Sequence, residues 1–528
     1  MPLIEVHNPN VKYGEEHIES RYVYRSNRVC QGAGGAIQVE TIDQTLEFRT
    51  ARKVPRVGAM FVGWGGNNGS TVTAGILANQ RKLRWRTRRG EQTANYYGSL
   101  TQSSTLNLGL TREMAEVFVP LTDLLPMVSP NDLVLSGWDC NRMNLGDAMR
   151  RAGVLDVPLQ DALYDHMKGL TPLPAAFDIN FLAENQAERA DNVMTTANKW
   201  DTVTQLRSDI RKFKAENALD KVIVLWTAST ERFCTHEAGI HGSADKLLAA
   251  IQANVAEIAP SVLYAVAAIL EGCSFINGSP QNTLCGGLVE LAQRHRVFVS
   301  GDDFKSGQTK MKSALVEFFV GAGLKPECIA SYNHLGNNDG YNLSEPQQFR
   351  SKEITKSNVV DDMIDSNKIL FPEGSKRPDH CVVIKYLPYV GDSKRALDEY
   401  NFSIFMGGEQ IVALHNICED SLLASPIIID LLVLTELMER VEIRVDTEDG
   451  ASFEPMDAVL SILSYFLKAP QVPKGTPVIN ALNRQKQAIE NVLRALVGLP
   501  ADSGMLLECR IPALRAAHEG AFSAAHRE

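Results

Sequence analysis

The chain has 528 residues, 44% of them hydrophobic and 22% charged, which is typical of a globular protein of about two to four domains. Its formal net charge of −10 argues against general nucleic-acid binding and against attraction to an anionic membrane surface. Nine cysteines are scattered without a C-x-x-C pair, which favours reduced thiols over disulfides or a zinc site, and we predict no metal centre.

Membrane insertion and secretion are not predicted. The longest apolar stretches, such as 427–434, fall well short of the roughly 18 residues that a membrane span needs, and Asp430 interrupts this one. The first ten residues, MPLIEVHNPN, lack the basic start and apolar core of a signal peptide. We therefore expect a cytoplasmic protein.

Residues 1–50 are polar and mixed, and we expect an arm or edge strands. Residues 57–79, VGAMFVGWGGNNGSTVTAGILAN, begin with a strand-length apolar run, break into four glycines, and resume at Ser70 with helical spacing. This order predicts a pyrophosphate site, because glycines let the backbone approach the anion and the helix presents free N–H groups. The predicted cradle is Gly65, Gly66, Asn67, Asn68 and Gly69.

The glycine run departs from the G-x-G-x-x-G fingerprint, since Asn68 stands where the third glycine is required. The acidic residue expected about 20 positions further on, to bind a ribose hydroxyl, has only Glu91 as a candidate. An ordinary tight turn in an α/β protein is the alternative. Residues 81–107, basic and then rich in Ser, Thr, Asn and Gln, predict a long connecting loop.

Two further apolar runs predict buried parallel strands. Residues 132–136 lead to Asp139, and 221–226 lead to the small polar residues 227–230; a predicted helix over 202–217 precedes the second run. Polar residues at strand ends are candidate cofactor contacts, or equally helix N-caps. Residues 244–271 are helical in pattern. Repeated strand–polar end–helix units predict a doubly wound parallel α/β sheet.

The segment 301–310, GDDFKSGQTK, follows a short predicted strand at 297–300 and looks like a phosphate loop. It fails the Walker A spacing, because Gly301 and Gly307 are six positions apart and Gln308 stands where lysine should. We therefore exclude a P-loop kinase or NTPase.

Beyond residue 311 the pattern changes to antiparallel strands, followed by helices that return to the first domain. The expected strands are 326–335, 380–387, 401–406 and 410–417, and the expected helices are 424–441, 456–467 and 480–497. We predict three regions: an N-terminal arm at 1–49, a dinucleotide-binding domain at 50–308 plus 424–528, and an inserted α+β domain at 309–423.

Lysines recur in polar settings in this half of the chain. Lys352 and Lys356 are four apart, and polar segments at 337–340, 391–394 and 419–421 follow predicted strands. A solvated helix face is the default interpretation of two such lysines. The number of polar strand ends instead favours a convergent site for a polyhydroxylated phosphate, where a desolvated lysine can also transfer protons.

Eight long motifs, in order, resemble the eukaryotic type of the myo-inositol-1-phosphate synthase family over residues 50–500. They are GWGGNNGS (63–70), NGSPQNT (277–283), GDDFKSGQTK (301–310), SYNHLGNNDGYNLS (331–344), FRSKEITKS (349–357), GDSKRALDEY (391–400), HNICEDSLLASPIIIDLL (415–432) and SYFLKAP (464–470).

The resemblance implies a Rossmann-like NAD-binding domain with an inserted catalytic and tetramerisation domain. It implies that D-glucose 6-phosphate, in its open form with a free aldehyde, is oxidised at C5, enolised, closed by an intramolecular aldol step and reduced at C5. The product is 1D-myo-inositol 3-phosphate, the first intermediate of inositol and hence phospholipid biosynthesis. The enzyme would be an isomerase, with bound NAD and no net redox change, in a homotetramer.

Site residues follow from the same resemblance, position by position. The implied catalytic residues are Lys352, Lys356, Lys394 and Lys468. The implied substrate contacts are Ser306, Gln308 and Asn337 together with the same four lysines. The implied cofactor contacts, beyond the glycine cradle, are Asp139, Gln186, Arg189, Thr227, Ala228, Ser229, Thr230, Asp303, Ser306, Asn337, Asn338, Asp339, Gly391, Asp392, Asp420 and Ser421. For Asp339, the resemblance implies contact with either the cofactor or a bound cation.

Two other functions remain to be weighed. A sugar-phosphate dehydrogenase would reduce NAD in proportion to its product, whereas an internal cyclase would leave no lasting NADH. A non-enzymatic NAD-binding scaffold would be expected to lack the lysines, and Lys352, Lys394 and Lys468 are all present. The histidines at 166, 236, 241 and 334 are spread out, and we expect structural roles for them.

Overall fold

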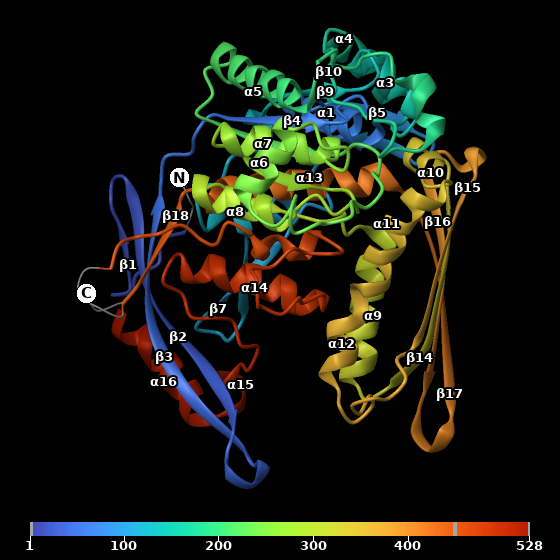
Figure 1. Ribbon diagram of the computed structural model, residues 1–528. Coiled ribbons are helices and arrows are strands. Elements are labelled where there is room, and N and C mark those ends of the chain that lie inside the picture. Colours follow the sequence, from blue (N-terminus) through green and yellow to red (C-terminus); the bar gives the residue numbers. More distant parts are fainter. Residues whose placement is uncertain (1–3, 447–450, 526–528) are drawn as a thin grey trace.

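The computed structural model describes residues 4–446 and 451–525, and a six-stranded parallel sheet lies at its centre (Figure 1). Its spatial order is β10-β9-β4-β11-β12-β13, which in chain order is 3-2-1-4-5-6, the arrangement of dinucleotide-binding doubly wound folds. The predicted fold class is therefore confirmed. The strands are β4 (Val57–Val62), β9 (Val134–Asp139), β10 (Leu173–Pro174), β11 (Lys221–Trp226), β12 (Ser274–Asn277) and β13 (Val299–Ser300).

Both faces of this sheet are covered by helices, which explains why its strands read as unbroken apolar runs. All six residues of β4 are buried: Phe61 belongs to the core on one face, and Met60 to the core on the other. The first face carries α1 (Asn67–Gln80), α3 (Leu145–Ala152), α4 (Val157–Met167) and α13 (Asp420–Met438). The second carries α5 (Lys199–Glu216), α6 (Ala244–Gln252), α7 (Pro260–Leu270) and α8 (Gly286–His295).

Helix α13 is long and apolar enough to cross a membrane, but 89% of that apolar window is buried against the sheet, so it is a core helix. Asp430 lies within it and is almost fully buried. Its carboxylate accepts hydrogen bonds from the backbone N–H groups of Leu100 (2.6 Å) and Thr101 (2.8 Å) and from the hydroxyl of Ser99 (2.7 Å). The charge thus caps the short helix α2 (Leu100–Ser103).

We expect Asp430→Ala to destabilise the protein by about 3 kcal/mol, because several buried donors would lose their acceptor together. Thermal unfolding should show a midpoint several degrees lower. Asp165→Ala, which removes an exposed carboxylate paired with Lys168, is the control and should leave the midpoint unchanged. Equal midpoints for the two variants would show that Asp430 does not stabilise α2.

A second sheet extends from the central domain, with helices along one side (Figure 1). Its order is β15-β14-β16-β17. The strands are β14 (Lys325–Leu335), β15 (Asp379–Tyr386), β16 (Ser393–Ser403) and β17 (Glu409–Glu419), and the helices are α9 (Gly307–Gly321), α10 (Asn338–Asn342), α11 (Pro346–Ser357) and α12 (Asp361–Ser366).

The expectation that these four strands are all antiparallel is wrong for one pair, since β14 and β15 are parallel. The segment between them runs through α10, α11 and α12, which is long enough for the crossover that parallel pairing requires. The third strand also begins earlier than the predicted 401–406, so that 391–394 both follows β15, as predicted, and leads into β16.

The N-terminal residues form a third sheet, of order β1-β2-β3-β18. Its strands are β1 (Val11–Tyr13), β2 (His17–Gln31), β3 (Ile37–Ala51) and β18 (Val441–Val445), and the long β2–β3 hairpin projects from the body (Figure 1). The predicted edge strands are therefore present. In this sheet β3 pairs with β18, the strand that follows α13. The N-terminal sheet therefore joins residues near the start of the chain to residues 441–445.

Two other local predictions are wrong. Residues 81–107 contain a hairpin, β5 (Arg84–Thr87) and β6 (Gly90–Thr93), then α2 and the start of β7 (Thr105–Leu110), which pairs with β8 (Glu116–Pro120). Residues 456–467 hold only a 3-10 turn, Ser461–Phe466, because their backbone bonds instead to Val299, through Ala458 and Leu460, and to Lys305, through Phe466. The helix expected at 480–497 is α14 (Leu482–Ala495), and α15 (Leu507–Arg510) and α16 (Pro512–Ala525) follow.

Candidate active site

A cavity opens where the strand order of the central sheet reverses, at the carboxyl ends of β4 and β11. Val62 and Trp226, the last residues of these strands, line it, and α10 and α11 close it from the side of the inserted sheet. Such switch points are where doubly wound sheets bind their ligands.

The glycine run forms a tight turn between β4 and α1. Gly63 has a φ of +87°, and a Cβ there would lie 2.6 Å from the Cα of Ala228. A Cβ on Gly69 would lie 2.4 Å from the carbonyl oxygen of Trp64. Gly66 is the N-cap of α1, and the first turn of that helix carries no acidic side chain. The free N–H groups of α1 therefore face an open end of the cavity that favours anions, which fits the pyrophosphate of a dinucleotide.

Asp139 ends β9, the strand beside β4, and lies against the glycine turn. Its carboxylate accepts the N–H of Asn141 at 2.9 Å; burial raises its pKa, while this bond and the charges of Arg189 and Arg151 oppose the rise. The neighbouring strand end is where a ribose-binding acid belongs. The spacing expected along the sequence does not lead to Asp139, because residues 81–133 are inserted before β9. Glu91, which the spacing indicated, lies exposed on β6.

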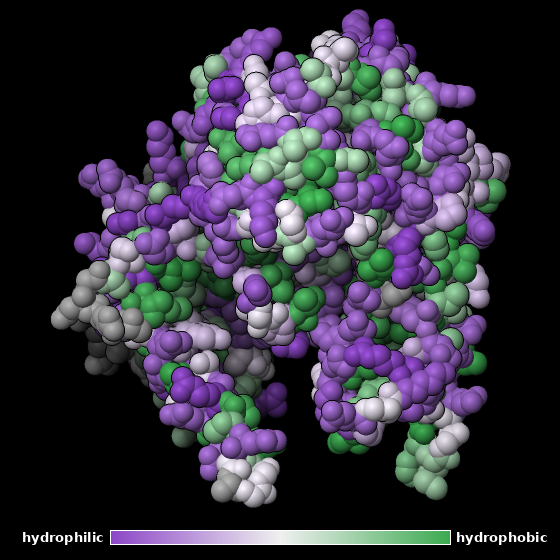
Figure 2. Space-filling model, viewed as in Figure 1, coloured by the Kyte–Doolittle hydropathy of each residue, from purple (hydrophilic) through white to green (hydrophobic). Residues whose placement is uncertain are grey.

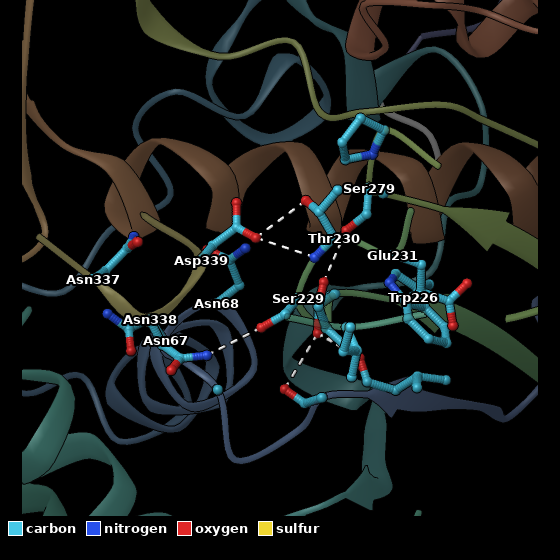
Figure 3. Close-up of a pocket in the computed structure, with 18 of the residues that line it drawn as sticks. Asn67, Asn68, Trp226, Ser229, Thr230, Glu231, Ser279, Asn337, Asn338 and Asp339 are labelled. Carbon is cyan, nitrogen blue, oxygen red and sulfur yellow. Dashed lines mark hydrogen bonds between the residues drawn. The ribbon is translucent and has the colours of Figure 1, made fainter. Parts of the chain in front are cut away.

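The loop after β11 is held by α10 from the inserted layer (Figure 3). Asp339 accepts hydrogen bonds from both the N–H and the hydroxyl of Thr230, each at 3.1 Å. Asn338 donates to the hydroxyl of Ser229 at 3.1 Å and to Gln186 at 2.9 Å. The two layers that flank the cavity are thus joined by direct bonds at its rim.

Asp392 lies just behind the cavity wall and joins three of its segments. Its carboxylate accepts from the side chains of Asn67 at 3.1 Å and Asn337 at 3.3 Å, and from the N–H of Ser421 at 2.8 Å. These partners begin α1, cap α10 and begin α13. Burial and the nearby Asp420 raise its pKa.

Three lysines converge at one end of the cavity around two aspartates. Lys352 of α11 and Lys468 both bind the same oxygen of Asp303, at 2.8 and 3.2 Å. Lys394 of β16 approaches Asp420 of α13 at 3.4 Å. Asp303 adopts left-handed backbone (φ +63°) and its carbonyl accepts the N–H of Lys468 at 2.7 Å, so its position is set by backbone as well as charge.

The shared carboxylate gives the two lysines different protonation behaviour. Burial opposes the ionised form of Asp303, but the charges of Lys352 and Lys468 outweigh it and lower its pKa. The pKa of Lys352 is raised, because Asp303 and Asp339 outweigh its burial. Burial, with Lys352 and Lys394 nearby, lowers the pKa of Lys468 to about 7. The carboxylate of Asp303 thus keeps Lys352 charged, whereas Lys468 remains able to titrate.

Lys356 and Gln308 lie one layer deeper, between α9, α11 and the inserted sheet. Lys356 donates to Gln308 and to Asn333, each at 3.3 Å, and is only 2% exposed. Burial and four neighbouring lysines lower its pKa well below the usual value. An ammonium in this position would be stabilised by an added anion.

Most of the predicted site residues lie together around the cavity. Those that line it are Gly66, Asn67, Asn68, Asp139, Gln186, Arg189, Thr227, Ala228, Ser229, Thr230, Asp303, Ser306, Asn337, Asn338, Asp339, Lys352, Lys394, Asp420 and Lys468. Those placed behind its wall are Gly65, Gly69, Gln308, Lys356, Gly391, Asp392 and Ser421.

Several residues of the wall were not predicted. Arg151, at the end of α3, donates to the carbonyl of Gly65 at 2.6 Å. Ser279 donates to the carbonyl of Ala228 at 2.8 Å, and Glu231 accepts from Ser261 at 2.5 Å, with burial raising its pKa to about 7. The signal for Ser279 was its place in the motif NGSPQNT (277–283), to which no role had been assigned. Within residues 4–446 and 451–525, no group of three or more His, Cys, Asp or Glu side chains could hold a metal ion.

A dinucleotide cavity that ends in a buried lysine–aspartate cluster defines a dinucleotide-dependent enzyme of the doubly wound α/β class. Comparison with known proteins gives the family. A family model of an NAD-binding domain, described as myo-inositol-1-phosphate synthase, matches residues 57–494. The chain belongs to the myo-inositol-1-phosphate synthase family, and its cofactor is NAD.

Individual relatives are similar along nearly the whole chain. Inositol-3-phosphate synthase of Trypanosoma brucei brucei is 64% identical over 524 residues, which cover 98% of this chain and 99% of that protein. Inositol-3-phosphate synthase 1 of Homo sapiens is 58% identical over 504 residues, covering 95% and 89%. The crystal structure of inositol-3-phosphate synthase from Caenorhabditis elegans superposes with a TM-score of 0.93 at 52% identity, covering 96% and 98%.

Proposed function

We propose that this protein is an inositol-3-phosphate synthase, an isomerase that converts D-glucose 6-phosphate to 1D-myo-inositol 3-phosphate and so begins inositol and phospholipid biosynthesis. The names of its similar relatives support the activity. The observation that carries the proposal is the meeting of Lys352, Lys394 and Lys468 at the end of the dinucleotide cavity. A dehydrogenase needs one acid–base group beside its cofactor, whereas several buried cations suit a reaction that also forms an enolate and closes a ring.

NAD, when bound, supplies the hydride acceptor for a carbon that is oxidised and later reduced again, so that the overall reaction is redox-neutral. Lys352, kept charged by Asp303, would stabilise negative charge on a substrate oxygen. Lys468, as the free amine, would accept the proton that leaves when the hydroxyl becomes a ketone. Lys394 with Asp420 would face the oxygen of the aldehyde that accepts the new carbon–carbon bond.

The phosphate of the substrate would lie at the start of α9. Ser306 is the N-cap of this helix, lines the cavity and makes no side-chain cap bond of its own. Gln308 follows in the first turn, and the buried Lys356 is bound to it. Helix N–H groups together with a buried cation suit a dianion. We retain 309–423 as the inserted catalytic and oligomerisation domain.

Phosphorus NMR tests the proposed activity against the dehydrogenase alternative. The protein would be mixed with glucose 6-phosphate and with NAD at a concentration far below that of the sugar. We expect many molecules of inositol phosphate for each NAD. Conversion that stops once the NAD has become NADH would instead establish a dehydrogenase, and NAD binding without any conversion would favour the scaffold.

The pH dependence follows from the pKa of Lys468, which lies at about 7. Because the free amine accepts the proton, kcat/KM should rise as pH increases through about 7 and then level off. Lys468→Arg stays charged throughout and should lose the reaction at every pH. Ionisation of the substrate phosphate also changes kcat/KM with pH. Inhibition by glucitol 6-phosphate, which carries the same phosphate, is measured over the same pH range and used to correct kcat/KM for this effect. A corrected profile that is flat from about pH 6 to about pH 8.5 would remove Lys468 as the base.

The homotetramer remains our proposal, supported by the outer face of the inserted sheet. Tyr332, Leu397, Ile411 and Ile417 lie on this face, each about half exposed. More apolar side chains, Ile404, Phe405 and Met406, are exposed at the β16–β17 turn, in the lower right of Figure 2. An apolar face of this extent is typical of an interface between copies.

We expect the variant Leu397→Arg/Ile411→Arg to lower the mass measured by light scattering below that of the wild-type tetramer, because it places cations in the apolar interface. Val157→Arg, on the exposed side of α4, is the control and should keep the tetramer. A double variant that remains tetrameric would place the interface elsewhere. We also propose a cytoplasmic location, supported by the nine free cysteines.

A further inference from the structure

A buried carboxylate, Asp398, lies beneath the lysine cluster and is not among the residues assigned above. It is on the inner face of β16, between Ala396 and Tyr400, and is fully buried (0% exposed). The same face of the neighbouring strand β14 presents Ser331, directly opposite Asp398, and Asn333. Helix α9 packs against this face, so Asp398 lies between the sheet and the helix that begins the phosphate site.

Asp398 determines how the amide of Gln308 is oriented. The nitrogen of that amide donates a hydrogen bond to Asp398, while its oxygen accepts one from Lys356 at 3.3 Å. A carboxylate can only accept, so the amide nitrogen must face Asp398 and the amide oxygen must face Lys356. The second carboxylate oxygen accepts from the hydroxyl of Tyr400 at 3.2 Å.

The charge of Asp398 also acts between two buried lysines. Lys356 has only the neutral oxygens of Gln308 and Asn333 as its hydrogen-bond acceptors in the described structure, and four other lysines surround it. Lys312, one turn beyond Gln308 on α9, donates to Ser331 at 2.8 Å and to a ring nitrogen of His380 at 2.9 Å. Burial lowers the pKa of Lys312 to about 8, and the charge of Asp398 opposes this shift. Asp398 therefore offsets positive charge in a layer where cations outnumber anions.

We propose that Asp398 is a positioning residue for the phosphate of the substrate: it orients Gln308 and, through it, keeps the amine of Lys356 in place, facing the start of α9, where the bound dianion would stabilise its charged form. This inference rests on the proposed function. It makes phosphate recognition depend on a residue that touches neither the substrate nor the cofactor. A purely structural Asp398 would instead affect stability and every ligand alike.

Binding of two ligands to the NAD-loaded protein tests the proposal. Glucitol 6-phosphate carries the phosphate but lacks the aldehyde, so it cannot undergo the aldol closure, and its apparent dissociation constant can be measured by calorimetry. For Asp398→Asn, which keeps the shape and removes the charge, we expect at least tenfold weaker binding of glucitol 6-phosphate. The dissociation constant of NAD should change less than twofold, and KM for glucose 6-phosphate should rise more than kcat falls.

Tyr400→Phe is the matched control, because it removes the other hydrogen bond to Asp398 and keeps the charge. It should bind glucitol 6-phosphate within twofold of wild type. The proposal would be overturned if Asp398→Asn bound glucitol 6-phosphate as tightly as Tyr400→Phe does. It would also be overturned if Asp398→Asn lost as much affinity for NAD as for glucitol 6-phosphate. If the wild-type protein itself does not bind glucitol 6-phosphate, the proposed function fails instead.

Gln308→Leu separates Asp398 from Lys356 and leaves both residues in place, so it serves if Asp398→Asn is insoluble. This variant should weaken the binding of glucitol 6-phosphate by a similar factor. Wild-type affinity for this ligand in Gln308→Leu would also overturn the proposal. Adding Asp398→Asn to Gln308→Leu should cause no further loss, because Asp398 acts through Gln308. Losses that multiply in the double variant would show that the two residues act independently.

Discussion

Lys352→Ala is expected to reduce turnover on the order of 10³-fold while leaving the dissociation constant of NAD within a few-fold of wild type. The variant loses the ammonium that, in our proposal, stabilises negative charge on the substrate. It also leaves Asp303 with Lys468 as its remaining partner in the shared ion pair, which would raise the pKa of Lys468 and keep it protonated. One substitution would thus remove a fixed charge and a base together.

Steady-state kinetics and NAD fluorescence titration measure these two effects separately. Lys376→Ala is the control, since it removes an exposed lysine that pairs with Asp379 across the surface. This control should retain turnover within twofold. Wild-type turnover in Lys352→Ala would exclude Lys352 from the mechanism, and an equal loss of NAD affinity would assign it to cofactor binding.

Gly63→Ala is expected to weaken NAD binding at least a hundredfold, which corresponds to about 2.7 kcal/mol. The new methyl group would meet the backbone of Ala228 at 2.6 Å, and the residue would have to keep a φ of +87°. Relief of this contact requires the glycine turn to move away from the loop after β11, which opens the cradle. Equilibrium dialysis with labelled NAD gives the dissociation constant directly.

Gly75→Ala, in the helix α1 that follows the glycine turn, is the matched control. A Cβ at Gly75 meets no atom within 4 Å, and alanine is the better helix former. We expect unchanged NAD binding and equal or higher thermal stability. If Gly63→Ala bound NAD as tightly as Gly75→Ala, the turn between β4 and α1 would not be the pyrophosphate cradle.

The local elements of the central domain were predictable because their signals are local. The apolar runs at 57–62 and 221–226 coincide with β4 and β11, since strands buried on both faces must be apolar throughout. The glycines were recognisable for a related reason, because these positions have no room for a Cβ. A Cβ on Gly63 would meet Ala228, and one on Gly69 would meet Trp64. The lysines, by contrast, were assigned through the resemblance of whole motifs to a known family.

The remaining features depend on contacts between distant residues. Asp139, and not Glu91, lies beside the glycine turn, because an inserted segment changes the spacing along the sequence but leaves neighbouring strand ends adjacent. Residues 456–467 have helical composition, yet their backbone groups bond to those of Val299 and Lys305. Asp398 looks like any alternating residue of a strand until the packing of α9 brings Gln308 to it. None of these pairings has a signature in a single stretch of sequence.

The most direct test of an internally balanced isomerase is the fate of the hydrogen on C5 of the substrate. Glucose 6-phosphate carrying deuterium at C5 would be converted with catalytic NAD, and the product and the nucleotide would be examined by mass spectrometry. We expect the deuterium to be retained in every inositol phosphate molecule, on the carbon that was C5, with none accumulating in NADH. Deuterium that collects in NADH beside an oxidised sugar phosphate would contradict this account and establish a dehydrogenase.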